Sequence, residues 1–147
     1  MNIKDFDNNY IANTYARFPI VLKEGRGSLV IDENGKEYID MATGIAVNTF
    51  GYSDNEWTKA VCEQLNKLQH TSNLYYSEPC ALLAKTLCEK TGMKKVFFSN
   101  SGAEANECAI KVARKYAAQK KGSDYYTIIT LKNSFHGRTI TTLAATG

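Results

Sequence analysis

The sequence predicts an α/β fold in which two buried strands flank one long helix. A short apolar run at residues 96–98 passes directly into a helix start at Ser101. Residues 126–131 are rich in β-branched and aromatic residues with little alternation, as expected for a strand buried on both faces. The helix between them ends before Gly122. Strand, helix and strand at this spacing are typical of a right-handed βαβ unit in a parallel sheet.

The first 52 residues predict an irregular arm followed by a β-hairpin. Residues 3–18 mix aromatic and polar side chains without a clean period, so we expect only a helical turn or two there. Two short β-prone runs, 29–32 and 37–40, flank Asn34-Gly35, which is the strongest short-range hairpin signal. Residues 41–52 are predicted to be a loop with an extended piece over 45–47.

Two helices are predicted next. The first begins after Ser53 or Asp54, either of which can cap it. Its apolar residues recur at helical spacing and predict a stripe packed against a core: Trp57, Val61, Leu65 and Leu68. After a loop over 70–76, Pro79 favours a second helix start and Gly92 a helix end.

The third helix is predicted to begin at Ser101, and its first turn is a candidate anion site. Ser101 and Glu104 have the spacing of a capping box, in which each side chain satisfies one backbone donor. The amides of Gly102 and Ala103 then stay free at the positive end of the helix dipole, where phosphate binds readily. Taken alone, these residues favour a plain well-capped helix over a ligand site, and both interpretations stay open here. Small residues along one face of the helix predict close packing against the sheet.

A second candidate loop follows the strand predicted over 126–131. Ligands of open α/β sheets collect at the carboxyl ends of strands, so this loop and the start of the third helix should face one crevice. Phe135 offers an aromatic face, and Arg138 offers a guanidinium suited to bidentate carboxylate binding. Together the two loops predict a site for an anionic, ring-bearing ligand and a carboxylate. His136 is interpreted as a supporting or core histidine rather than an acid–base group.

Composition excludes several other functions. The net charge of +3 on 147 residues is small and dispersed, which argues against nucleic-acid and membrane partners. No secretory signal or membrane-spanning run is evident, so we expect a cytoplasmic protein. The cysteines never form a C-x-x-C pair and fall in predicted helices, so they are interpreted as reduced, buried thiols rather than a metal site: Cys62, Cys80, Cys88 and Cys108.

Two motifs carry a resemblance that runs almost from end to end of the chain. They are FSNSGAEANE at residues 98–107 and NSFHGRT at 133–139, with supporting segments at 32–40, 44–48 and 71–76. In this order and spacing they resemble the class III, pyridoxal-phosphate-dependent aminotransferases of fold type I. The resemblance implies an N-terminal portion of such an enzyme. Residues 1–52 are expected to form an arm and hairpin segment, and residues 53–147 the beginning of the large, mainly parallel-sheet domain that binds the cofactor.

The resemblance also implies roles for four residues and a reaction. The cofactor pyridoxal 5'-phosphate would place its phosphate on the amides of Gly102 and Ala103 and its ring against Phe135, while Arg138 would bind the substrate α-carboxylate. The most similar members transfer the amino group of N-acetylornithine to 2-oxoglutarate, giving glutamate, in arginine biosynthesis, and they act as homodimers. Their Schiff-base lysine lies beyond the second motif, so no catalytic residue is expected within this chain, which we expect to be inactive alone.

Two alternatives stay open. One is another ω-aminotransferase, acting on ornithine, succinylornithine or 4-aminobutyrate. Sequences resembling ornithine δ-aminotransferase tend to carry a tyrosine near the position of Gly44, whereas glycine leaves room for an acylated side chain. The other is a non-catalytic phosphate-binding fragment. No G-x-G-x-x-G or G-x-x-x-x-G-K sequence is present, so the usual dinucleotide and P-loop signatures are missing.

Overall fold

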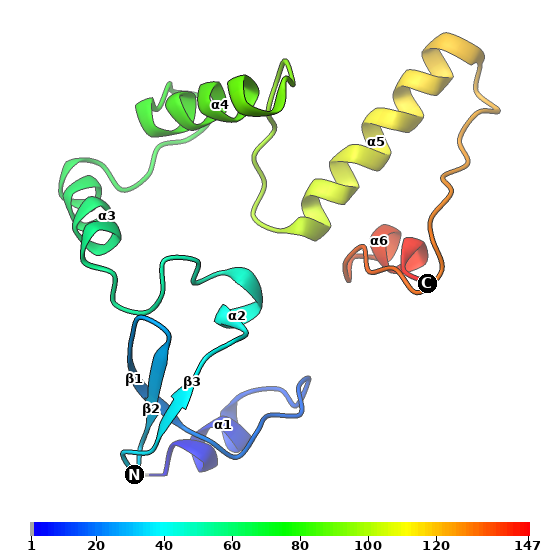
Figure 1. Ribbon diagram of the computed structural model, residues 1–147. Coiled ribbons are helices and arrows are strands. Elements are labelled where there is room, and N and C mark those ends of the chain that lie inside the picture. The colour runs from blue at the N-terminus through cyan, green and yellow to red at the C-terminus, as the bar shows by residue number, and fades with distance from the viewer. Residues whose placement is uncertain (1) are drawn as a thin grey trace. The chain divides into compact units, whose positions relative to one another are not determined.

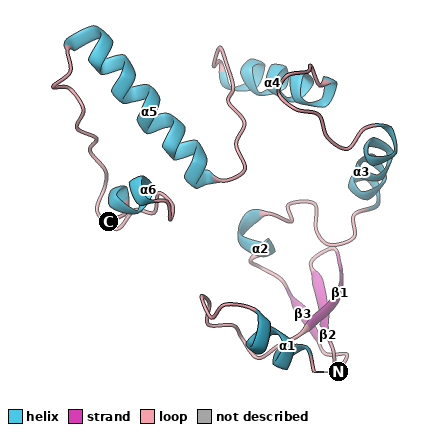
Figure 2. Ribbon diagram, turned by 180° about the vertical axis from the view of Figure 1, so that it is seen from behind, coloured by secondary structure: helices cyan, strands magenta, loops and turns pink. Residues whose placement is uncertain are grey.

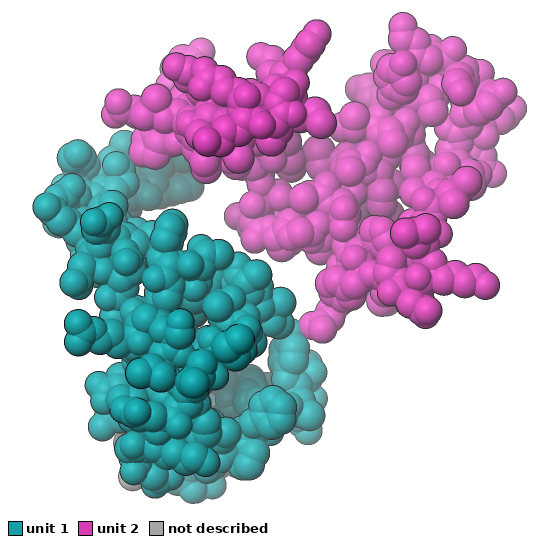
Figure 3. All heavy atoms as spheres, viewed as in Figure 1, with its two compact units in different colours: residues 1–75 teal, residues 76–147 magenta. Residues whose placement is uncertain are grey.

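The computed structural model describes residues 2–147 and consists of two compact units, Met1–Tyr75 and Tyr76–Gly147 (Figure 3). The first unit contains α1 (Ile3–Tyr10), β1 (Leu22–Arg26), β2 (Leu29–Asp32), β3 (Glu37–Ile39), α2 (Thr43–Ala46) and α3 (Asn55–Lys67) (Figure 1). The second contains α4 (Glu78–Thr91), α5 (Gly102–Lys121) and α6 (Ile140–Ala145). The domain boundary expected between residues 52 and 53 stays a prediction.

A three-stranded antiparallel sheet in the order β1-β2-β3 forms the centre of the first unit (Figure 2). The predicted hairpin is confirmed, with Val30 opposite Tyr38 and Gly35 in the left-handed region at φ 80°. Only a residue without a Cβ adopts that conformation readily. The sequence does not predict β1, because its Lys-Glu-Gly core is poor in strand-forming residues. It forms because β2 supplies a partner for its backbone.

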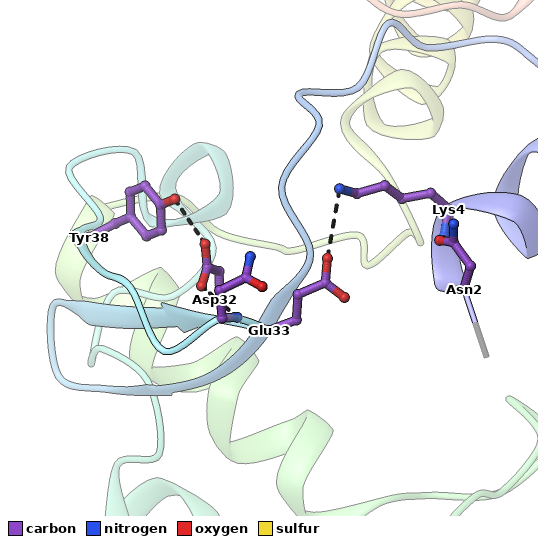
Figure 4. Close-up of polar contacts among 6 residues, drawn as sticks. Asn2, Lys4, Asp32, Glu33 and Tyr38 are labelled. Atoms are coloured by element: carbon purple, nitrogen blue, oxygen red, sulfur yellow. Dashed lines mark hydrogen bonds and ion pairs between the residues drawn. The ribbon is translucent and has the colours of Figure 1, made fainter.

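The turn of the hairpin is organised by Asp32, whose side chain is buried. Its carboxylate accepts hydrogen bonds from the amides of Asn34 at 2.9 Å and Lys36 at 3.0 Å. It also accepts one from the Tyr38 hydroxyl at 3.0 Å (Figure 4). The Lys36 amide contributes most to lowering the pKa of this carboxyl.

The predicted helix starts are confirmed. Asp54 rather than Ser53 caps α3, accepting from the Trp57 amide at 2.8 Å. Pro79 lies in the first turn of α4, and Gly92 ends that helix in the left-handed conformation at φ 73°. The arm contains one short helix, α1, which agrees with the expected helical turn or two.

The two strands predicted around α5 are absent from residues 2–147. The segments 96–98 and 126–131 run as extended connections without ladder partners (Figure 1). The predicted βαβ unit is therefore wrong for the described chain. A β-prone sequence specifies a backbone preference, but a strand exists only where a neighbouring strand supplies donors and acceptors.

The apolar stripes predicted to be buried are exposed instead. Trp57 on α3 is 56% exposed, and Val112 on α5 is 61% exposed. Cys62 and Cys80 are exposed, and the other two cysteines are half-buried, so the interpretation as buried thiols is wrong. Periodicity identifies the face of a helix that favours burial without identifying what covers it. No helix within residues 2–147 combines the length and apolar character needed to cross a bilayer.

Candidate functional site

The start of α5 is built by Ser101, which has an extended backbone at φ −154° and ψ 161°. Its hydroxyl accepts from the Glu104 amide at 3.2 Å, which confirms half of the predicted capping box. The other half is displaced by one residue. The Glu104 carboxylate accepts from the amide of Asn100 at 2.6 Å, where a capping box would use that of Ser101. Two hydrogen bonds therefore fix the start of the helix, one to the Ser101 hydroxyl and one to the Glu104 carboxylate.

The amides of Gly102 and Ala103 are left free by this arrangement, as predicted. Neither donates to an acceptor anywhere in residues 2–147, because the carbonyls four positions before the first residues of a helix lie outside the helix. A Cβ added to Gly102 would meet no heavy atom within 4 Å, so the space beside it is open. Two parallel donors at the positive end of a 20-residue helix fit a phosphate group.

The second motif lies directly against the start of α5, and the crevice that the two loops are expected to line stays a prediction. The Asn106 side chain donates to the carbonyl of His136 at 2.7 Å. Gly137 is buried with φ 132°, and a Cβ there would come within 2.6 Å of the Cβ of Ala103. Glycine is required at position 137 for two reasons: its backbone has a positive φ, and the space beside it cannot hold a Cβ. The loops meet through these contacts although no strands lead into them.

The far end of the second motif is fastened by α6, which the sequence analysis does not predict. Thr139 and Thr142 form a reciprocal capping box at the start of this helix, and Thr142 is fully buried. The Thr139 hydroxyl also donates to the carboxylate of Glu107 on α5 at 2.6 Å. That hydrogen bond is the main cause of the lowered pKa of Glu107. Thr142 occupies the position where a capping box ordinarily has Glu or Gln, so the usual sequence signal for this helix start is missing.

Phe135 and Arg138 lie together on the exposed side of this loop. The guanidinium carbon of Arg138 is 5.9 Å from the centroid of the Phe135 ring, within the range of a cation–π contact. Phe135 is 71% exposed, so its aromatic face is accessible to a planar ligand. Phe135 and Arg138 therefore lie in the loop that contacts the start of α5, where the Gly102 and Ala103 amides are free, and all four residues belong to one unit.

Gly44 lies in the first unit, in a turn whose conformation the sequence analysis predicts wrongly. Residues 45–47 are expected to be extended, but the four residues of α2 all have positive φ values, from 49° to 63°. They form a left-handed turn, which costs about 1–2 kcal/mol for each non-glycine residue. Ile45 on the turn is 93% exposed, whereas Thr43 is half-buried.

The sequence shows which family these features belong to. A model of the family "Aminotransferase class-III" matches residues 10–147. The chain belongs to the class-III aminotransferases. The resemblance inferred from the two motifs is therefore confirmed.

Curated relatives in this family are named acetylornithine aminotransferase. The protein from Haemophilus ducreyi is 59% identical over 145 residues, which cover 99% of this chain and 37% of that protein. The protein from Caldanaerobacter subterraneus is 49% identical over 142 residues, covering 97% of this chain and 36% of that protein. The chain thus spans little more than a third of the length of the curated relatives it matches.

Solved structures of aminotransferases share the fold. Ornithine aminotransferase from Toxoplasma gondii is 33% identical with a TM-score of 0.88, covering 95% of this chain and 33% of that one. N-acetylornithine aminotransferase from Stenotrophomonas maltophilia is 43% identical with a TM-score of 0.79, covering 90% of this chain and 35% of that one. The fold that this chain shares with these aminotransferase structures confirms the predicted fold class.

Proposed function

We propose that the whole protein containing this chain is a pyridoxal-phosphate-dependent aminotransferase that transfers the amino group of N-acetylornithine to 2-oxoglutarate. The observation that carries the proposal is the meeting of the two motifs in one unit, where the free amides of Gly102 and Ala103 adjoin the loop bearing Phe135 and Arg138. Family membership and the names of the curated relatives support the same activity.

The start of α5 would hold the cofactor through its phosphate. Gly102 and Ala103 supply two amide donors, and the open space beside Gly102 lets a phosphate oxygen approach the backbone closely. Glu104 does not compete for these donors, because its carboxylate is held on the other side of Ser101 by the amide of Asn100. The helix start is therefore arranged to receive an anion from outside the chain.

Phe135 would orient the cofactor ring. Its exposed face offers a stacking surface, and the ring is carried on a loop that Asn106 and Gly137 fix against α5. When bound, pyridoxal phosphate supplies an electron sink for negative charge that develops at the substrate α-carbon. The residues of this chain would bind and orient the cofactor, while the Schiff-base lysine stays predicted beyond the second motif.

Arg138 would bind the α-carboxylate of each substrate. Its guanidinium presents a planar fork of donors that matches a carboxylate, and the contact with Phe135 restricts where the fork lies. N-acetylornithine, 2-oxoglutarate and glutamate all carry this carboxylate, so one arginine serves both half-reactions.

The choice of N-acetylornithine over ornithine rests on Gly44. A Cβ at Gly44 would meet only the Asn48 side-chain nitrogen at 3.7 Å and the Val47 Cβ at 4.0 Å, so the chain itself leaves this position open. Glycine at this position, near which sequences resembling ornithine δ-aminotransferase tend to carry a tyrosine, supports an acylated donor. The remaining expectations, a cytoplasmic homodimer that acts in arginine biosynthesis, belong to this proposal.

A substrate panel on the whole protein tests the proposal. The purified holoenzyme is assayed for glutamate formation from 2-oxoglutarate with N-acetylornithine, ornithine, succinylornithine or 4-aminobutyrate as the donor. We expect kcat/KM for N-acetylornithine to exceed that for ornithine by about tenfold or more, because a pocket discriminates well between donors that differ in a whole acyl group. Equal rates with ornithine would contradict the assignment of Gly44, and no transamination with any donor would contradict the proposed function.

A further inference from the structure

The carboxylate of Glu107 ends a chain of hydrogen bonds that begins at a fully buried residue, Thr142. The hydroxyl of Thr142 lies 2.7 Å from that of Thr139, which lies 2.6 Å from the carboxylate of Glu107. Because an ionised carboxylate can only accept, Thr139 donates to Glu107 and Thr142 donates to Thr139. The Thr139 hydroxyl is the main cause of the lowered pKa of Glu107, which therefore stays ionised at neutral pH. The residue directly after Arg138 is thus fixed to α5.

Asn106, the residue before Glu107, holds the other side of the same loop. Its side-chain nitrogen donates to the carbonyl of His136 at 2.7 Å. The amide of His136 donates in turn to the hydroxyl of Thr146 at 3.1 Å. Both backbone groups of the residue directly after Phe135 therefore have partners, and one of those partners belongs to α5.

Phe135 and Arg138 are themselves exposed, although the backbone between them is buried. Gly137 packs against Ala103 of α5 so closely that no Cβ fits between them. Since an exposed side chain is not enclosed by packing, its position depends on the backbone that carries it. The contacts of this loop with α5 therefore decide where the aromatic ring and the guanidinium lie.

The helix that holds the loop also carries the two free amides. Asn106 and Glu107 lie four and five residues after Gly102 in the 20-residue helix α5. That separation is about 6–8 Å along the helix axis, and neighbouring side chains point about 100° apart around it. One rigid element therefore sets the distance between the phosphate donors and the loop, and it contacts the loop through two side chains that point in different directions.

We propose that Asn106 and Glu107 are positioning residues that place Phe135 and Arg138 relative to the amides at the start of α5. The inference rests on the proposed function, which assigns the cofactor ring to Phe135 and the substrate α-carboxylate to Arg138. Both positioning residues act through the backbone of the loop. Because each holds a different side of the loop, Asn106 acts on the affinity for pyridoxal phosphate and Glu107 acts on the KM of both substrates.

Two variants of the whole protein separate these effects. Asn106→Leu removes the donor at similar side-chain size, so we expect the dissociation constant of pyridoxal phosphate, measured by equilibrium dialysis, to rise about fivefold or more. KM for N-acetylornithine and for 2-oxoglutarate, measured at saturating cofactor, should stay within about twofold.

Glu107→Met removes the acceptor at similar side-chain length and is expected to have the opposite pattern. Both KM values should rise about fivefold or more while kcat stays within about twofold, because a carboxylate bound equally in the ground and transition states affects KM alone. The dissociation constant of pyridoxal phosphate should also stay within about twofold, since the phosphate donors precede Glu107 in the same helix. Glu107→Ala removes the same acceptor and replaces this variant if Glu107→Met does not fold.

Two further variants separate positioning from general stability. Glu107→Gln keeps an oxygen that can accept from the Thr139 hydroxyl, so both KM values should stay within about twofold of those of the unaltered protein. Glu89→Met is the matched control, since Glu89 forms an exposed ion pair with Lys85 on α4. It should change neither the KM values nor the affinity for the cofactor.

Hydrogen exchange of the whole protein gives a measurement that does not depend on activity. The amide of His136 should exchange faster in Asn106→Leu. The amide of Thr139, which donates to the hydroxyl of Thr142 at 3.0 Å, should exchange faster in Glu107→Met.

The outcomes distinguish the inference from the proposed function. If Asn106→Leu and Glu107→Met change cofactor affinity and KM alike, or change neither, the inference is overturned while the proposed function stands. The same holds if Glu107→Gln behaves like Glu107→Met, or if the exchange rates of the two amides stay unchanged. If the unaltered whole protein does not transaminate N-acetylornithine, both are overturned.

Discussion

Arg138 and Phe135 show how much of the candidate site is set by neighbouring residues of one loop. The guanidinium lies over the ring at 5.9 Å, so the group proposed to bind the carboxylate and the group proposed to stack on the cofactor restrict each other. A contact of this kind contributes about 0.5–1 kcal/mol at an exposed site, which is enough to bias the rotamer of a long side chain. The two side chains are thus partly ordered before any ligand binds.

Replacing Arg138 by lysine tests its proposed role at this scale. Arg138→Lys keeps the charge but removes the planar fork, so KM for N-acetylornithine and for 2-oxoglutarate should both rise about tenfold or more, which corresponds to about 1.4 kcal/mol. Steady-state kinetics of the whole holoenzyme give both values.

Arg114→Lys is the matched control, since the guanidinium carbon of Arg114 on α5 lies 5.8 Å from the centroid of the Tyr126 ring. It should leave both KM values within about twofold. A rise for one substrate alone in Arg138→Lys would show that this arginine does not bind the group the substrates share.

The helices illustrate which elements a local pattern can predict. The start of α5 was predictable because the Ser101–Glu104 spacing is a local signal. The left-handed turn at Thr43–Ala46 was not, because β-branched residues ordinarily favour extended backbone. The meeting of the two loops was predicted from topology, yet it is held by contacts such as Asn106 to His136, which leave no periodic trace in the sequence.

Gly137 tests the packing of the second motif on α5. Gly137→Ala would place a Cβ within 2.6 Å of the Ala103 Cβ, so the loop must move away from the helix start. We expect the variant to lose about 2–4 kcal/mol of unfolding free energy in the whole protein, from backbone strain and overpacking together.

Gly122→Ala is the control for strain alone. Gly122 has a similarly positive φ of 116°, but a Cβ there would meet no atom within 4 Å. Denaturant unfolding should show a loss of unfolding free energy about half as large or smaller, since only backbone strain contributes to it. Equal losses in the two variants would show that the contact between Gly137 and Ala103 contributes nothing to stability.

At the scale of the whole molecule, the predicted site residues and the sheet belong to different units. The unit Tyr76–Gly147 contains all four predicted site residues, and the unit Met1–Tyr75 contains the sheet and the left-handed turn. The two strands predicted at 96–98 and 126–131 do not form, because strand pairing depends on partners that no local pattern reveals. The fold class was nevertheless predictable, since motif order is a property of the whole chain.

The central claim is that the free amides at the start of α5 hold the phosphate of pyridoxal phosphate, and Gly102→Pro tests it most directly. Proline is tolerated at the first helical position and replaces the amide proton with a ring carbon, whereas Gly102→Ala keeps that donor. The measurement is the dissociation constant of pyridoxal phosphate from the whole protein by equilibrium dialysis. We predict that Gly102→Pro weakens binding about tenfold or more and Gly102→Ala about threefold or less, because a hydrogen bond to a charged group contributes about 1.5–3 kcal/mol. Equal affinity of the proline variant and the unaltered protein would contradict the claim.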